Sequence, residues 1–62
     1  MVSTGEIQEY LHGMNYPAGK SDLLSKAKSN NAPQDVIDML DRLPDQKFST
    51  PIDVNKAIGD IE

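Results

Sequence analysis

The most concentrated positive charge in this 62-residue sequence lies on Lys20, Lys26 and Lys28. Clustered ammonium groups attract phosphate groups or the acidic surface of a partner. The alternative is an ordinary solvated surface near a helix C-terminus, where cations are mildly favourable. A third possibility is that these lysines pair with an acidic segment, within the molecule or between two copies.

Such an acidic segment is present, because Asp35, Asp38 and Asp41 recur every three residues with only Arg42 opposing them. The basic and acidic segments, joined by a short turn, could also form a helix-turn-helix, which places its second helix in the DNA major groove. That helix would need donors for phosphates and base edges, whereas this one offers mainly carboxylates. The net charge of −4 also opposes a polyanion. Nucleic-acid binding is therefore the alternative function, and we expect a protein partner or self-association instead.

Two loop residues, Tyr16 and Pro17, complete the predicted partner surface. Loops that expose aromatic or proline side chains are common docking sites. Tyr16 and Phe48 have a second interpretation, as plugs at the open ends of a small core. The plug is favoured for Phe48, and it is closely balanced for Tyr16, whose hydroxyl requires water or a partner.

The residues that could perform catalysis or bind a metal form no recognisable set. His12 is the single histidine, at the end of a predicted helix, and there is no cysteine. A metal site needs several converging ligands, and the carboxylates are scattered over cap and surface positions. We therefore predict no enzyme activity, no cofactor and no metal.

The elements that position these residues follow from helix-start and helix-stop signals. Ser3, Gly19 and Thr50 each precede an acid by three residues, and a proline at position 33 suits the start of a helix. Stops are predicted at Gly13, at the two asparagines 30–31 and before a proline at position 44. The signals predict four helices over about residues 4–12, 20–30, 33–43 and 51–59. The intervening segments 14–18 and 45–49 are predicted to be a connector and a loop, and a trans Tyr16–Pro17 bond is favoured.

Apolar residues recur at helical spacing in all four segments and predict the core. Helices this short are not stable alone in water, so their apolar stripes must pack against one another. We therefore predict an all-α fold, a compact bundle of four short helices in a single domain, 1–62. The predicted core residues are Ile7, Tyr10, Leu11, Met14, Leu23, Leu24, Ala27, Val36, Ile37, Leu40, Leu43, Val54, Ala57, Ile58 and Ile61.

Nothing in the sequence predicts contact with a membrane. No apolar run approaches the roughly 20 residues that cross a bilayer, and the first residues lack the basic and apolar regions of a signal peptide. We therefore expect a cytoplasmic protein with no membrane association.

Four short motifs follow one another along the chain: Tyr16-Pro17-Ala18 with Lys20, Ala32-Pro33 with Val36, Leu43-Pro44-Asp45, and Pro51 with Asp53-Val54. Together they resemble a small prokaryotic family of unknown function. The resemblance covers nearly the whole chain and implies a helical domain without an assigned activity, cofactor or catalytic residue. Two cap positions depart from the family pattern: glycine stands at position 19 where serine is expected, and asparagine at 31 where glycine is expected. The regular, well-capped helices and the lack of a reactive cluster lead us to predict a non-enzymatic protein-interaction module.

Overall fold

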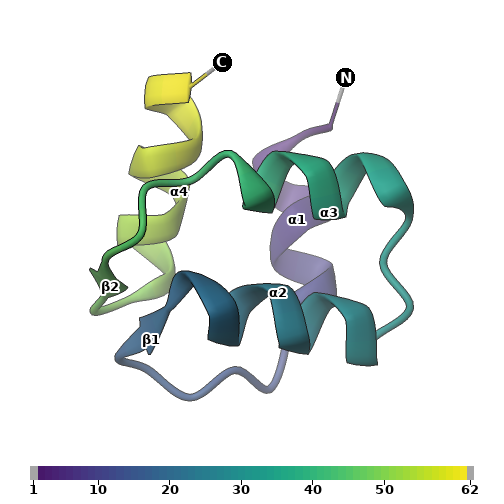
Figure 1. Ribbon diagram of the computed structural model, residues 1–62, viewed down its shortest axis with the longest axis horizontal. Coiled ribbons are helices and arrows are strands. Elements are labelled where there is room, and N and C mark those ends of the chain that lie inside the picture. The colour runs from purple at the N-terminus through teal and green to yellow at the C-terminus, as the bar shows by residue number, and fades with distance from the viewer. Residues whose placement is uncertain (1, 62) are drawn as a thin grey trace.

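The computed structural model describes residues 2–61, one residue short of the predicted domain at each end. They form four helices, as predicted: α1 (Thr4–Tyr10), α2 (Lys20–Ser29), α3 (Gln34–Asp41) and α4 (Pro51–Ile61) (Figure 1). The all-α prediction needs one correction, because two short strands are also present, β1 (Ala18–Gly19) and β2 (Lys47–Phe48).

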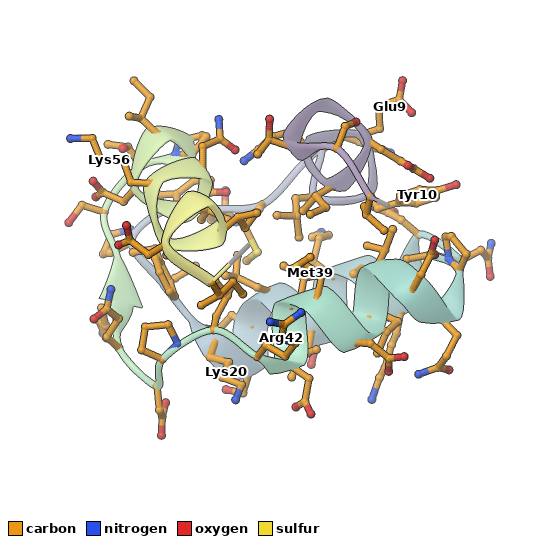
Figure 2. The ribbon with its side chains drawn as sticks, turned by 90° about the horizontal axis from the view of Figure 1, so that it is seen from above. Glu9, Tyr10, Lys20, Met39, Arg42 and Lys56 are labelled. Carbon is orange, nitrogen blue, oxygen red and sulfur yellow. The ribbon has the colours of Figure 1, made fainter. Side chains whose placement is uncertain are left out.

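The helices form two layers (Figures 1 and 2). In front, α2 and α3 lie side by side and run in opposite directions, a helical hairpin whose members pack mainly on each other. Behind them α1 and α4 run across the hairpin, also in opposite directions to each other, so that α1 begins and α4 ends at the same edge of the molecule. The core lies between the two layers.

The two strands pair antiparallel, with Ala18 opposite Phe48 and Gly19 opposite Lys47. They come from the segments predicted to be a connector and a loop. Strands of two residues have no alternating pattern to detect, and their partners lie about thirty positions apart in the chain. The pairing therefore corrects the prediction for both segments, and it joins the chain before α2 to the chain before α4.

The core is formed by apolar residues from all four helices and both strands. Phe48 is fully buried, which confirms its predicted role as a plug. Met39 is buried, whereas the prediction had placed Ile37 in the core and not Met39. The reason is that residues 36, 39, 40 and 43 lie on one face of the helix, and this face is directed towards the core. None of the buried residues among 2–61 is polar or charged; they are Val2, Ile7, Leu11, Ala18, Leu23, Ala27, Val36, Met39, Leu40, Leu43, Phe48, Val54, Ala57 and Ile58.

Five predicted core residues are only half-buried and pack against the edge of this core. They share a position at the flank of a helix or just beyond its end, where one side of the residue still meets solvent. They are Tyr10, Met14, Leu24, Ile37 and Ile61.

All four helices end at positions that differ from the prediction, and α2 ends one residue earlier, at Ser29. α1 ends two residues earlier, because the backbone tightens there: the Leu11 N–H donates to Gln8 O at 3.1 Å, three residues back. α3 starts one residue later and ends two residues earlier. α4 continues two residues beyond its predicted end at Gly59. The predicted left-handed positions are confirmed, with φ of 83° at Gly13 and 61° at Asn31, and the Tyr16–Pro17 bond is cis rather than trans.

The predicted helix caps are present as hydrogen bonds. Ser3 Oγ accepts the Glu6 N–H at 3.1 Å at the start of α1. Thr50 Oγ1 accepts the Asp53 N–H at 3.3 Å before α4. At the start of α2 Gly19 has no side chain to donate or accept, so the cap consists of its own N–H donating to the following acid, Asp22 Oδ2, at 3.0 Å.

Side-chain amides and one guanidinium join helices that are distant in the sequence. Gln8 Nε2 on α1 donates to Asn55 Oδ1 at 2.9 Å and to Pro51 O at 3.3 Å, both on α4. Asn30 Nδ2, after α2, donates to Tyr10 O at 2.9 Å, which satisfies a carbonyl at the end of α1. Arg42, after α3, donates to Ile61 O at 2.9 Å at the end of α4. The Gln8 bonds join the two helices of the rear layer, and the Asn30 and Arg42 bonds join the hairpin to that layer.

Candidate interaction surface

The three predicted lysines all lie on α2, but they do not form one patch. Successive residues of an α-helix turn by about 100°, so Lys26 and Lys28 project on nearly opposite sides of α2. Lys28 is exposed and Lys26 is half-buried. Lys26 Nζ lies beside the turn after α1, 3.8 Å from the position that a Cβ would take on Gly13. Lys26 is therefore separated from the surface formed by the other two lysines.

Lys20 pairs with the acidic helix α3 within the molecule. Its Nζ lies 3.9 Å from Asp41 Oδ1, and the Asp41 side chain is 71% exposed. This is one of the arrangements that the sequence left open. Because the carboxylate is in contact with water, the pair is worth about 0–1 kcal/mol. The contact also shows that the flank of α2 with Lys20 lies next to the flank of α3 with Asp41.

Tyr16 and Pro17 lie in the connector before β1, and their environments differ. Pro17 is exposed, whereas Tyr16 is half-buried and packs against the core. The Tyr16 hydroxyl is buried without a hydrogen-bond partner among the described residues. Burial also raises the pKa of this hydroxyl above its ordinary value, because the charged phenolate would be poorly solvated. The aromatic ring therefore acts as a plug more than as an exposed docking residue.

The adjoining flanks of α2 and α3 form one continuous surface, which faces away from α1 and α4. Figure 2 shows Lys20 on this outer side of the hairpin. Residues spaced by four lie on the same face of a helix, which extends the surface along both helices. We call the six residues concerned the hairpin face: Lys20, Leu24 and Lys28 of α2, and Ile37, Asp38 and Asp41 of α3.

The hairpin face has two half-buried apolar side chains, Leu24 and Ile37, with charged side chains on either side of them. The α2 half is basic and the α3 half is acidic. Lys28, Asp38 and Asp41 are exposed, and the Lys20–Asp41 contact is the one ion pair between side chains of residues 2–61. The sequence analysis named the three aspartates as an argument against DNA binding and as possible partners of the lysines, but it did not place them on the predicted partner surface. Leu24, Ile37, Asp38 and Asp41 were therefore missing from the predicted surface, although their spacing was a usable signal.

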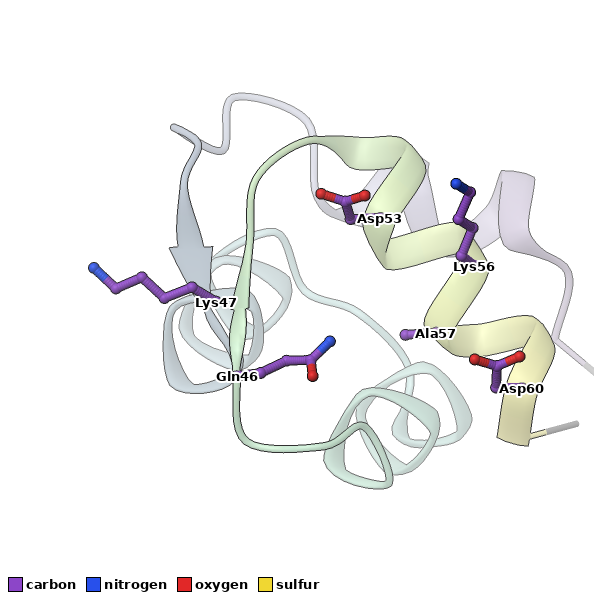
Figure 3. Close-up of a pocket in the computed structure, with 6 residues that line it drawn as sticks. All are labelled: Gln46, Lys47, Asp53, Lys56, Ala57 and Asp60. Carbon is purple, nitrogen blue, oxygen red and sulfur yellow. The ribbon is translucent and has the colours of Figure 1, made fainter.

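A second surface feature is a shallow depression between β2 and α4, of about 390 Å³ (Figure 3). Figure 3 shows Gln46 directed towards α4 and Lys47 directed away from it. Asp53 on this wall is already engaged, because its Oδ2 accepts the Ser49 N–H at 3.0 Å. The remaining lining residues are Lys56, Ala57 and Asp60. The depression has no side chain arranged as a nucleophile beside a base.

Clusters of metal-binding side chains and membrane-spanning helices are both absent from residues 2–61. No group of three or more histidine, aspartate or glutamate residues within this range could hold a metal ion. No helix within the same range has the length and apolar character needed to cross a membrane.

The path of α2 and α3 bears on the helix-turn-helix alternative. In that motif the two helices cross at about 90–120°, so that the second can enter the major groove. Here they run side by side in opposite directions (Figure 1). The exposed flank of α3 has carboxylates, those of Asp38 and Asp41. The geometry offers no support for a recognition helix.

Comparison with known proteins agrees with the resemblance stated from the sequence motifs. No curated protein and no solved structure matches the chain. One family model matches residues 2–55, which run from before α1 through both strands into the first turns of α4. The chain therefore belongs to the family described as protein of unknown function DUF2795.

Proposed function

We propose that this domain is a non-enzymatic protein-interaction module that binds its partner through the hairpin face. The observation that carries the proposal is the anatomy of that face, with two half-buried apolar residues, Leu24 and Ile37, between a basic and an acidic flank. Specific interfaces commonly have an apolar centre inside a polar rim. A cytoplasmic location stays a prediction from the sequence.

The charged groups of the hairpin face support the proposal because few of them are used inside the molecule. Lys28 is exposed, and no ion pair to it is formed by residues 2–61. Asp38 is exposed and accepts one hydrogen bond, from Gln34 Nε2 at 2.8 Å within the same helix. Complementary charges at the rim of an interface steer encounter and select the partner.

The proposal is tested by comparing two variants that change charge equally at different places. Asp38→Lys reverses a charge on the hairpin face, and Asp60→Lys makes the same change on α4, beside the depression. The wild-type protein, immobilised at low salt, should capture a stoichiometric protein partner or further copies of itself from cell extract. Asp38→Lys should lose that capture and Asp60→Lys should keep it.

Two outcomes would contradict the proposal. Absence of any stoichiometric capture by the wild-type protein, under gentle conditions and at low salt, would contradict the function as a module. Equal capture by the two variants would contradict the assignment of the function to the hairpin face. Thermal melting of both variants checks that each is folded before the comparison is made.

A further inference from the structure

We propose that the partner on the hairpin face is a second copy of this chain, bound face to face about a two-fold axis that runs parallel to α2 and α3. This inference depends on the proposed function and specifies its partner. A two-fold interface uses the same surface of both copies, so that surface must be complementary to itself. Every contact between two different residues then occurs twice, once on each side of the axis. The hairpin face meets that condition because one half is basic and the other half is acidic.

The direction of the axis follows from the positions of the charges. A half-turn about an axis between α2 and α3 and parallel to both places α2 of one copy over α3 of the other. Lysines then face aspartates at both sides of the axis. A half-turn about the perpendicular axis would place α2 over α2 and bring Lys20 opposite Lys28, which repel each other.

The heights of the residues along the helices also match. The side chains of Lys20 and Asp41 are in contact, which places the first turn of α2 beside the last turn of α3. Leu24 lies four residues after Lys20, and Ile37 lies four residues before Asp41. With a rise of 1.5 Å per residue, each lies about 6 Å along its helix from its residue of the ion pair. The two-fold axis therefore brings Leu24 of each copy to within about one helical turn of Ile37 of the partner subunit.

The same arrangement brings Lys28 near Asp38 of the partner subunit. Lys28 lies about 12 Å along α2 from Lys20, and Asp38 lies about 4.5 Å along α3 from Asp41, so the two residues are about 7.5 Å apart along the helix axis. Side chains on a helix tilt towards its N-terminus, and the two helices are antiparallel, so both side chains lean towards each other. A lysine side chain is long enough to reach across that separation. Lys28 and Asp38 thus form two equivalent ion pairs across the axis.

The size of the surface predicts a weak dimer. The two helices are about 12–15 Å long, and side by side they are about 20 Å wide, so the face covers about 300 Å² on each copy. The total of about 600 Å² is half the lower bound of about 1,200 Å² for stable interfaces. Association should therefore be seen at high protein concentration and should weaken with salt, because screening acts on exposed charges.

The test uses two charge reversals that are complementary to each other. In a homodimer of Lys28→Glu the new carboxylate faces Asp38 of the partner subunit, and in a homodimer of Asp38→Lys the new ammonium faces Lys28 of the partner subunit. Sedimentation equilibrium at low salt should show the wild type in a monomer–dimer equilibrium, and about tenfold weaker self-association for each variant. An equimolar mixture should form a heterodimer about as well as the wild type, because both cross-axis pairs then join opposite charges.

Lys47→Glu and Asp60→Lys provide matched controls, since they make the same charge changes away from the hairpin face and should leave the equilibrium unchanged. Restored association in the mixture also shows that both variants are folded. A wild type that stays monomeric at all concentrations, a mixture that stays monomeric, or controls that weaken association equally would each overturn the two-fold dimer. Capture of a different protein through the hairpin face by a monomeric wild type would also overturn it, while leaving the proposed function intact.

Discussion

The two helix pairs of this protein are held together in different ways. In the hairpin, α2 and α3 are joined by a four-residue connection, and the one side-chain ion pair within residues 2–61 lies between them at an exposed position. By contrast, α1 and α4 come from opposite ends of the chain and are joined by hydrogen bonds from the neutral amide of Gln8. The antiparallel strands add a second long-range connection beside α4.

The difference indicates a division of roles between the pairs. Neutral hydrogen bonds keep their strength in salt, and they position α1 against α4 without placing charge there. A short connection already holds α2 and α3 together, so the charged residues on their outer side are not needed for folding. These residues are therefore available to a partner, and most single changes to them should have little effect on stability.

The largest expected effect comes from the buried residue that joins the strands to the core. Phe48→Ala should lower the free energy of unfolding by about 3–5 kcal/mol, because it leaves a large cavity at a fully buried position. Such a loss is comparable to the whole stability of a small domain. Leu40→Ala in the hairpin should cost about 2–5 kcal/mol for the same reason. Thermal or urea unfolding measures both.

Ile52→Ala is the control for these cavity variants, because its side chain is 63% exposed and the change should stay within about 0.5 kcal/mol. A loss below about 1 kcal/mol for Phe48→Ala would show that the strand region does not anchor the core. The comparison between the pairs would then need revision.

Smaller losses of stability are expected when the side-chain hydrogen bonds of Gln8 and Gln34 are removed, and the two losses should differ. Gln8→Ala should cost about 1–2 kcal/mol, because it removes both hydrogen bonds between α1 and α4. Gln34→Ala removes one bond, to Asp38 within the same helix, and should cost less than about 0.5 kcal/mol. Urea unfolding of the two variants gives the comparison. Equal losses would indicate that the amide of Gln8 has no special role in joining α1 to α4.

Tyr16→Phe should leave stability unchanged or raise it by up to about 1 kcal/mol, because it removes a buried hydroxyl that lacks a partner. The raised pKa of Tyr16 sets the pH dependence. The folded state holds the phenolic proton of Tyr16 more tightly than the unfolded state. The protonated hydroxyl therefore makes its full contribution to the free energy of unfolding below the unfolded pKa of about 10, and that contribution is lost as pH rises through the folded pKa.

Unfolding measured from neutral to alkaline pH should therefore show a smaller alkaline loss of stability for Tyr16→Phe than for the wild type. Tyr10→Phe makes the same chemical change on α1 and serves as the control for tyrosine content. A clear destabilisation by Tyr16→Phe at neutral pH would reveal that the hydroxyl has a favourable contact.

The smallest effect is expected for the exposed ion pair of the hairpin. Lys20→Ala should change the free energy of unfolding by less than about 0.5 kcal/mol, because the Asp41 carboxylate is largely exposed. Chemical unfolding at low and at high salt measures the change. A loss above about 1 kcal/mol that disappears in salt would mean that charge does hold α2 and α3 together.

The sequence predicted most of the fold and only part of the candidate site. Three of the four helices begin at the predicted residue, and Ser3 and Thr50 make the expected hydrogen bonds. These features depend on groups within four positions of one another, so the residue types are sufficient to show them. Of the five predicted surface residues, Lys20 and Lys28 belong to the hairpin face, Pro17 is exposed elsewhere, and Tyr16 and Lys26 are half-buried.

By itself, then, the amino-acid sequence determined where three of the four helices start, most of the residues that avoid water and where the charges are concentrated. The tertiary structure decided that Ala18 pairs with Phe48, that Met39 faces the core, and that the basic flank of α2 adjoins the acidic flank of α3. The physical reason is the range of the interactions. Caps and apolar spacing act within one or two turns of the chain, whereas these three results depend on how whole helices pack.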